Sequence, residues 1–241
     1  MNVLMLTPMV PSDVATSAGA IVMRDEVRAV ATRHRVTLAA LAMPDDEAAI
    51  RSLEDDGIRV HAVRRSVVQG VRGGVRRAQL GVRWRLGELP LRTLVFLESS
   101  MQRVLDRLPG SPFDVVHVLD NAMAAYRRPD GRRALLTEYE TRVEPEDGVI
   151  DTPDDESTAP REAEHSRWLR YQSAIWTQFD HVQVFTERDA EVVRRLAPAV
   201  TDRICVNPFG VDVPAAVPTD GDDGRFSGRQ FAADHGGLRR T

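Results

Sequence analysis

The chain of 241 residues contains no lysine, a single cysteine and few aromatic residues. Its 32 basic residues are therefore all arginine, and the formal net charge of −4 gives no overall attraction to nucleic acid, so we expect no nucleic-acid partner. One cysteine excludes an internal disulfide. Because Cys205 falls inside an expected strand, the sequence predicts a buried structural thiol.

Segments that would send the chain into or across a membrane are also missing. The first apolar run, Val3–Leu6, is too short for a secretory signal, and no basic residue precedes it. No run reaches the ~18 apolar residues that a spanning helix needs. These absences predict a cytoplasmic protein in a reducing compartment.

No G-x-G-x-x-G follows the first expected strand, which removes the main support for a dinucleotide-binding enzyme. Apolar strand-like segments instead alternate with segments of helical periodicity. This alternation predicts an α/β fold, with one Rossmann-like, doubly wound, mainly parallel sheet and helices on both faces. We expect strands over 2–7, 35–42, 58–63, 113–118, 133–137, 181–185 and 203–207, and helices over 20–32, 45–56, 91–108 and 161–179.

The clearest strand–helix–strand unit lies near the end of the chain. His181–Phe185 has strand composition, and Thr186 is a good helix N-cap. Pro198 ends the following helix, after which Arg203–Asn207 is expected to form a second buried strand. Gly210 would give the backbone freedom to turn sharply after that strand.

This unit resembles the end of the N-terminal domain in GT-B glycosyltransferases of the group 1, family 4 type. The family has a strand "aD-x-v-x-v-x-S/T", a helix, and then "i-x-v-i-P-x-G-v-D". This chain departs from the family by having Asn-Pro-Phe-Gly where Pro-Asn-Gly is commoner. A βαβ unit of another doubly wound enzyme, such as a nucleotide-sugar epimerase, is the alternative. The matching residues are Asp180, Val182, Val184, Thr186, Ile204, Val206, Asn207, Pro208, Gly210, Val211 and Asp212.

The resemblance implies a hinge and a phosphate site. In the family, the last motif marks the crossing to the second domain, which assigns an interdomain hinge to Asn207, Pro208, Gly210 and Asp212. A glycine of the first loop lies near the sugar-nucleotide phosphates, where a helix N-terminus favours an anion. Only Gly19 remains where many relatives have two glycines, and a plain turn glycine is the alternative. The N-terminal matches are Pro8, Pro11, Gly19, Val27, His34 and Val36.

Candidate site residues follow from the same resemblance. His117 lies near the end of a strand resembling "f-D-v-V-h-x-h", where it would contact the acceptor or sugar, or simply cap the sheet. Glu138 stands nearest the family's acceptor-side histidine, and a carboxylate there can orient a sugar hydroxyl or act as a base. We therefore expect His117 and Glu138 to be catalytic, and Gly19, Glu140 and Thr186 to bind acceptor or phosphate. No metal or other cofactor is expected.

The segment from Arg64 to Arg92 is rich in arginine interleaved with apolar residues. If it is helical, it forms a basic amphipathic surface suited to anionic lipid headgroups, and many family 4 relatives dock on membranes through this domain. That function would place the protein peripherally on the inner face of the membrane. A solvated arginine face over a core-facing stripe is the alternative. Its glycines are expected to weaken any long continuous helix.

The pattern stops after Asp212, so the resemblance covers residues 1–213. We expect residues 1–213 to form the acceptor-side domain, and 214–241 to be a disordered or irregular tail in place of a donor-binding domain of about 150 residues. That absent domain would supply the donor-binding Arg/Lys pair and the E-x7-E glutamates.

The resemblance implies a retaining glycosyltransferase that moves a sugar from a nucleotide-sugar donor to a sugar or lipid-linked acceptor. The isolated chain should then have little or no activity. The alternative is a non-catalytic Rossmann-like module that binds a membrane or a partner subunit.

Overall fold

The computed structural model describes residues 1–12, 18–66, 70–108, 113–129, 131–139, 141 and 158–210. The chain divides into two units, Met1–Phe209 and Gly210–Thr241. All helices and strands described below belong to the first unit. The tail expected over 214–241 lies outside the described residues and stays a prediction.

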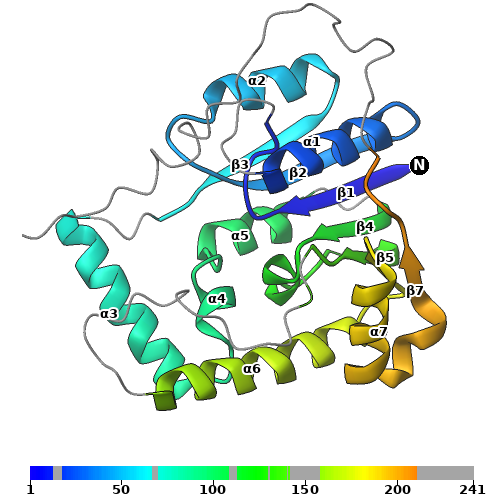
Figure 1. Ribbon diagram of the computed structural model, residues 1–241. Helices are drawn as coiled ribbons and strands as arrows, with labels where there is room; N and C mark the ends of the chain where they lie inside the picture. The colour runs from blue at the N-terminus through cyan, green and yellow to red at the C-terminus, as the bar shows by residue number, and fades with distance from the viewer. Residues whose placement is uncertain are drawn as a thin grey trace, which may run out of the picture. The chain divides into compact units, whose positions relative to one another are not determined.

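A seven-stranded, all-parallel sheet forms the centre of the first unit, which confirms the predicted fold class (Figure 1). The strand order is β3-β2-β1-β4-β5-β6-β7. The order therefore reverses between β1 and β4, which is the topological switch point of the sheet. The strands are β1 (Asn2–Thr7), β2 (Arg35–Ala42), β3 (Arg59–Arg64), β4 (Phe113–Leu119), β5 (Gly131–Thr137), β6 (His181–Val184) and β7 (Ile204–Val206).

Helices cover both faces of this sheet (Figure 1). α1 (Ala18–Ala31) and α2 (Glu47–Asp55) pack on one face. Among the described helices, none is long and apolar enough to cross a membrane. The opposite face is covered by α5 (Ser99–Arg107), η1 (Asn121–Ala125), α6 (Thr158–Trp176), α7 (Glu187–Leu196) and η2 (Pro198–Arg203). α4 (Leu91–Leu94) packs on η1, and α3 (Gly70–Leu86) packs on α4.

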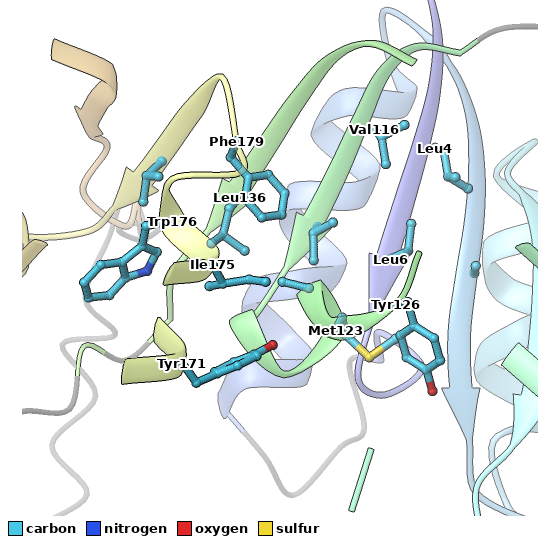
Figure 2. Close-up of a cluster of buried hydrophobic side chains, with 14 of the residues drawn as sticks. Leu4, Leu6, Val116, Met123, Tyr126, Leu136, Tyr171, Ile175, Trp176 and Phe179 are labelled. Atoms are coloured by element: carbon cyan, nitrogen blue, oxygen red, sulfur yellow. The ribbon is translucent and has the colours of Figure 1, made fainter. Parts of the chain in front are cut away.

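The central strands read as continuous apolar runs because both of their faces are buried. In β1, Leu4 and Leu6 face the cluster under α5 and α6, whereas Val3 and Met5 face α1. Successive side chains point to opposite faces of a strand, so one apolar run supplies both cores. Figure 2 shows the larger cluster, in which Trp176 and other side chains of α6 pack towards the strand residues.

The helix expected over 91–108 is broken into α4 and α5 by tertiary hydrogen bonds. The Tyr126 hydroxyl donates to the carbonyl of Phe96 (2.5 Å) and accepts from the backbone N–H of Glu98 (2.7 Å). The Glu98 carboxylate accepts from Ser66 and Arg76. These long-range partners replace helical hydrogen bonds, and the apolar spacing of the segment carries no sign of them.

α3 is continuous over Gly70–Leu86 despite its glycines, and the Arg76–Glu98 ion pair (3.2 Å) holds it to the rest of the unit. The expectation of a second buried strand at the end of the chain was wrong. β7 is the edge strand rather than a buried one, and Cys205 is consequently exposed. An edge position cannot be read from the local composition of a strand.

Substitution of Gly131 would test how closely β4 and β5 pack. A Cβ at Gly131 would lie 2.7 Å from Cγ2 of the buried Val116, closer than real contacts allow. We expect Gly131→Ala to lower the free energy of unfolding by about 1–3 kcal/mol in urea denaturation. Gly74→Ala is the matched control, since its added Cβ would meet no atom within 4 Å apart from the adjacent backbone of α3, and it should stabilise α3 by about 0.5–1 kcal/mol. Equal stability of the two variants would contradict this packing.

Candidate functional site

Open α/β sheets bind ligands at the carboxyl ends of their strands, near the switch point. In this chain the relevant ends are those of β1, β4, β5 and β6. Three predicted site residues belong to them: His117 lies in β4, Glu138 directly follows β5, and Thr186 caps the helix after β6. The contacts of each side chain show which of them the fold brings together.

Glu138 is buried on the α6 side of the sheet, with 2% of its surface exposed. Its Oε2 accepts hydrogen bonds from Asn121 Nδ2 (2.7 Å) and Trp176 Nε1 (2.9 Å). The backbone carbonyl of Asn121 in turn accepts from the Tyr171 hydroxyl (2.7 Å). Glu138 therefore ties the end of β5 to η1 and α6, and its catalytic role stays a prediction.

His117 is buried on the opposite face, beneath α1. Its Nε2 lies 2.7 Å from Thr137 Oγ1 and 3.5 Å from Glu26 Oε1. Burial lowers the pKa of His117 to about 3, so the ring is neutral at pH 7 and the short distance to Glu26 is not an ion pair. His117 and Glu138 thus lie on opposite sides of the sheet and do not form a catalytic pair with each other.

The residue that the sequence analysis missed is Glu26, at the centre of a polar cluster on the α1 side. Its Oε1 accepts from Thr137 Oγ1 (3.2 Å) and Gln183 Nε2 (3.3 Å), and its Oε2 accepts from the Tyr139 hydroxyl (2.9 Å). The donors come from adjacent strands, because Thr137 of β5 is in register with Gln183 of β6. The fold therefore places one carboxylate among neutral donors at the carboxyl ends of β5 and β6.

The position of Glu26 in the apolar pattern of α1 could have identified it from the sequence. Met23, Val27 and Val30 form the core-facing stripe of α1, at helical spacing. Glu26 lies three residues after Met23 and next to Val27, so a charged side chain stands on the buried face of the helix. Charged residues are almost never buried without partners, and such a position predicts a polar cluster beneath the helix.

The electrostatics of the cluster favour a reactive carboxylate. Burial raises the pKa of Glu26 above its ordinary value of 4.5, although hydrogen bonds from Tyr139, Thr137 and Gln183 oppose that shift. Burial and the neighbouring Glu26 also raise the pKa of Tyr139 far above its usual range, so the phenol remains a donor. The Glu26 side chain keeps 17% of its surface exposed. It can therefore accept a hydrogen bond from a ligand hydroxyl, or a proton.

Thr186 is confirmed as the N-cap of α7. Its Oγ1 accepts from the backbone N–H of Asp189 (3.1 Å) and lies 2.5 Å from Asp189 Oδ2, to which it donates. Thr141 also donates to this carboxylate (2.5 Å). Acidic residues in the first turn of α7 occupy the favourable end of the helix dipole. The predicted contact of Thr186 with acceptor or phosphate stays a prediction.

For the remaining predicted positions, the structure gives few side-chain contacts that bear on function. Gly19 is half-buried in the first turn of α1, and its phosphate-binding role stays a prediction. Asn207 extends the β6–β7 ladder by donating to the Val184 carbonyl (2.8 Å). Gly210 does not adopt a positive φ, so the backbone freedom expected there is not used. Glu140 and Asp212 lie outside the described residues, and the hinge assigned to Asn207, Pro208, Gly210 and Asp212 stays a prediction.

Asp120, which follows β4, has a strained backbone, with φ 80° and ψ 132°. Among the described non-glycine residues, it alone has a positive φ. Its carboxylate accepts from the backbone N–H of Ala122 (2.8 Å) and caps η1. Strain of this kind is concentrated at functional sites, which agrees with a site at this edge of the sheet.

Within the described part of the chain, no group of three or more His, Cys, Asp or Glu side chains is arranged to hold a metal ion. The expectation that function requires no metal or other cofactor stays a prediction.

No family model and no curated protein matches this chain. Anabaena HepE in complex with UDP and glucose is similar in fold, with 12% identity, a TM-score of 0.41, and coverage of 87% of this chain and 45% of that one. Arabidopsis thaliana UGT89C1 complexed with UDP-L-rhamnose has 13% identity, a TM-score of 0.42, and coverage of 89% and 52%. A pyrophosphate-dependent kinase of the ribokinase family, complexed with a pyrophosphate analog and myo-inositol, has 11% identity, a TM-score of 0.39, and coverage of 87% and 73%.

This chain therefore spans about half the length of HepE and UGT89C1. Because the identities and TM-scores are low, no residue role passes from these proteins to this chain.

The buried His117 predicts a specific acid sensitivity. Its pKa is lowered to about 3 in the folded state from the ordinary 6.5, so the stability it contributes is complete above pH 6.5 and is lost as the pH falls towards 3. Between pH 7 and 5 this loss amounts to roughly 2 kcal/mol. We expect His117→Gln, which does not titrate, to remove that part of the pH dependence in urea denaturation.

The control is His181→Gln, which changes an exposed histidine of β6. It should keep the pH dependence of the wild type. Parallel stability curves for the wild type and His117→Gln over this range would show that His117 does not titrate as its burial requires.

Proposed function

We propose that this chain is the acceptor-side Rossmann-like lobe of a nucleotide-sugar-dependent glycosyltransferase. The observation that carries the proposal is the partly exposed Glu26 carboxylate, held by three neutral donors at the carboxyl ends of β5 and β6. The family-4-like motifs support it, because their segments fall in order on β6, α7 and β7 at this edge of the sheet.

The proposed chemistry assigns a clear task to each member of the cluster. An acceptor hydroxyl donates its hydrogen bond to Glu26, while Tyr139, Thr137 and Gln183 keep the carboxylate oriented. During transfer, the bond from the anomeric carbon to the diphosphate breaks and a bond to the acceptor oxygen forms. The hydroxyl proton leaves to Glu26 or to the departing diphosphate.

The finer parts of the proposal rest on the sequence resemblance. They are retention of the anomeric configuration, a nucleotide-sugar donor held largely by a second lobe, a sugar or lipid-linked acceptor, independence from metals, and a cytoplasmic location. Since the donor-binding Arg/Lys pair and the E-x7-E glutamates are not assigned in this chain, we propose that activity requires the second lobe.

The purified chain should bind glycans without turning over nucleotide sugars. We expect a biotinylated chain, displayed on streptavidin to gain avidity, to retain a selective subset of an immobilised glycan array. Incubation with UDP-sugars and the retained glycans should give no product by NMR. Glu26→Gln should weaken retention, whereas Glu162→Gln, at an exposed position on α6, should not.

Two results would contradict the proposal. A folded chain that retains no glycan would remove the acceptor-binding function. Turnover within the ordinary enzyme range of about 1–10³ s⁻¹ would show that the donor site is already complete in this chain.

As a second function, we propose peripheral docking on anionic membranes through α3. The apolar residues Val75, Val82 and Leu86 are exposed by 59%, 51% and 85%. At 100° per residue they lie within about 40° of one another around the helix, and we call them the α3 stripe. Arg83 and Arg85, both exposed, flank it on its two sides. An exposed apolar stripe between arginines is typical of helices that lie in a membrane interface.

Several arginines of the basic surface predicted over Arg64–Arg92 make contacts within the protein. Arg65 stacks over Phe96 (4.2 Å), Arg76 pairs with Glu98, and Arg92 stacks over Trp168 (5.3 Å). These arginines serve internal packing, which leaves the end of α3 as the more favourable part of the segment for lipid contact.

α3 is held to α6 through its inner side. Trp84 Nε1 donates to Glu164 Oε2 (2.6 Å), and the Arg167 guanidinium stacks over the Trp84 ring (4.4 Å). With Trp84 on the side of α3 opposite the α3 stripe, the stripe faces outwards, where it can meet a membrane without rearrangement of the fold.

Liposome co-sedimentation tests the docking function. We expect the chain to bind vesicles containing phosphatidylglycerol more strongly than phosphatidylcholine vesicles, with binding reduced by salt. Replacing Val75, Val82 and Leu86 together by serine should abolish binding. Met43→Ser is the control, because Met43 is also exposed (44%) but lies outside α3. Absence of binding to both vesicle types would rule out docking, and a triple variant that still binds would place it elsewhere.

A further inference from the structure

Three aromatic side chains, Tyr139, Phe185 and Phe209, form a contact chain at the carboxyl ends of β5, β6 and β7. Tyr139 packs edge-on against Phe185, with centroids 5.2 Å apart and an interplanar angle of 62°. Phe185 and Phe209 are stacked, with centroids 3.7 Å apart and an angle of 20°. We call these residues the aromatic stack.

The two ends of the aromatic stack differ in exposure. Phe185 is buried, with 8% of its surface exposed, whereas Phe209 is 50% exposed. The buried ring supports the outer ring from one side and limits its rotation. Phe209 therefore presents a pre-oriented apolar surface to solvent, as aromatic residues lining ligand sites do.

Tyr139 joins the aromatic stack to the Glu26 cluster. Its ring contacts Phe185, and its hydroxyl donates to Glu26 Oε2 at 2.9 Å. Its raised pKa keeps that hydroxyl protonated, so the connection persists at neutral pH. An apolar platform and a hydrogen-bonding carboxylate are thus held by the same side chain at one edge of the sheet.

We infer that Glu26 and the aromatic stack form one carbohydrate subsite, which binds a neutral saccharide of at least two rings. One ring donates a hydroxyl to Glu26, and the next lays its C–H face on Phe209. Two aromatic rings lie along the contact path from Glu26 to Phe209, and a pyranose is about the size of one such ring. This inference rests on the proposed function and specifies its acceptor.

The chemistry distinguishes a saccharide from the other candidate ligands. A pyranose has an apolar face of C–H groups, which the electron-rich face of an aromatic ring attracts, and a rim of hydroxyl donors. A lipid chain would use Phe209 but has no donor for Glu26. A nucleoside diphosphate would bring negative charge towards the Glu26 carboxylate, which disfavours its phosphates at this position.

Saturation-transfer NMR with cellobiose, maltose and lactose tests the subsite. We expect at least one disaccharide to bind more tightly than methyl β-glucopyranoside, and sorbitol, which has hydroxyls but no ring, to give no signal. Phe209→Ala should weaken disaccharide binding by about threefold to tenfold, close to the level of the monosaccharide. Phe209→Tyr keeps an aromatic face and should preserve binding.

Glu26→Gln should weaken binding of both the disaccharide and the monosaccharide. Met43→Ala is the control, because Met43 is also an exposed apolar residue but belongs neither to the subsite nor to the α3 stripe. Circular dichroism and thermal unfolding of each variant separate loss of binding from loss of fold.

Three outcomes would overturn the inference: no disaccharide binds the wild type, Phe209→Ala binds as tightly as the wild type, or Phe209 matters while Glu26→Gln has no effect. The last outcome would indicate a purely apolar ligand. If the glycan array retains the chain in any of these cases, the proposed acceptor lobe stands and only the location of its subsite is wrong. A blank array removes both.

Discussion

A parallel sheet must be covered by apolar side chains on both faces, and this constraint organises the described structure. β1 and β2 obey it, with Leu4 and Leu6 on one face and Val3 and Met5 on the other. On the α1 side of β4, β5 and β6 this rule is broken, because His117, Thr137 and Gln183 occupy positions where apolar residues are expected. Buried polar groups need partners, and Glu26 of α1 supplies them. The candidate site is the region where this constraint is relaxed.

Two carboxylates near the end of β5 show how environment assigns different roles. Glu138 is fully buried and accepts from Asn121 and Trp176, so it joins elements of the fold. Glu26 is partly exposed, and burial raises its pKa against the effect of its donors. A carboxylate that is both reachable and raised in pKa suits contact with a reacting hydroxyl, whereas one enclosed by protein donors suits structural stability.

Two side chains both pack within the fold and hold an exposed surface in place. Trp84 holds α3 against α6 through Glu164, which leaves the α3 stripe exposed. Tyr139 similarly binds Glu26 with its hydroxyl and Phe185 with its ring. In both cases, an amphipathic aromatic residue fixes the orientation of a surface for which we propose a binding function.

The sequence by itself determined the α/β class, the seven strands and the capping of α7 by Thr186, because apolar periodicity and capping chemistry are local properties. It did not determine that β7 is an edge strand that exposes Cys205, or that Tyr126 breaks the helix expected over 91–108. Nor did it reveal that His117 and Glu138 face opposite sides of the sheet, or that Glu26 lies at the centre of the polar cluster on the α1 side. Strand order and contacts between distant residues decided these features, from 28 positions apart for Glu98 and Tyr126 to 157 for Glu26 and Gln183, and neither leaves a periodic pattern in the chain.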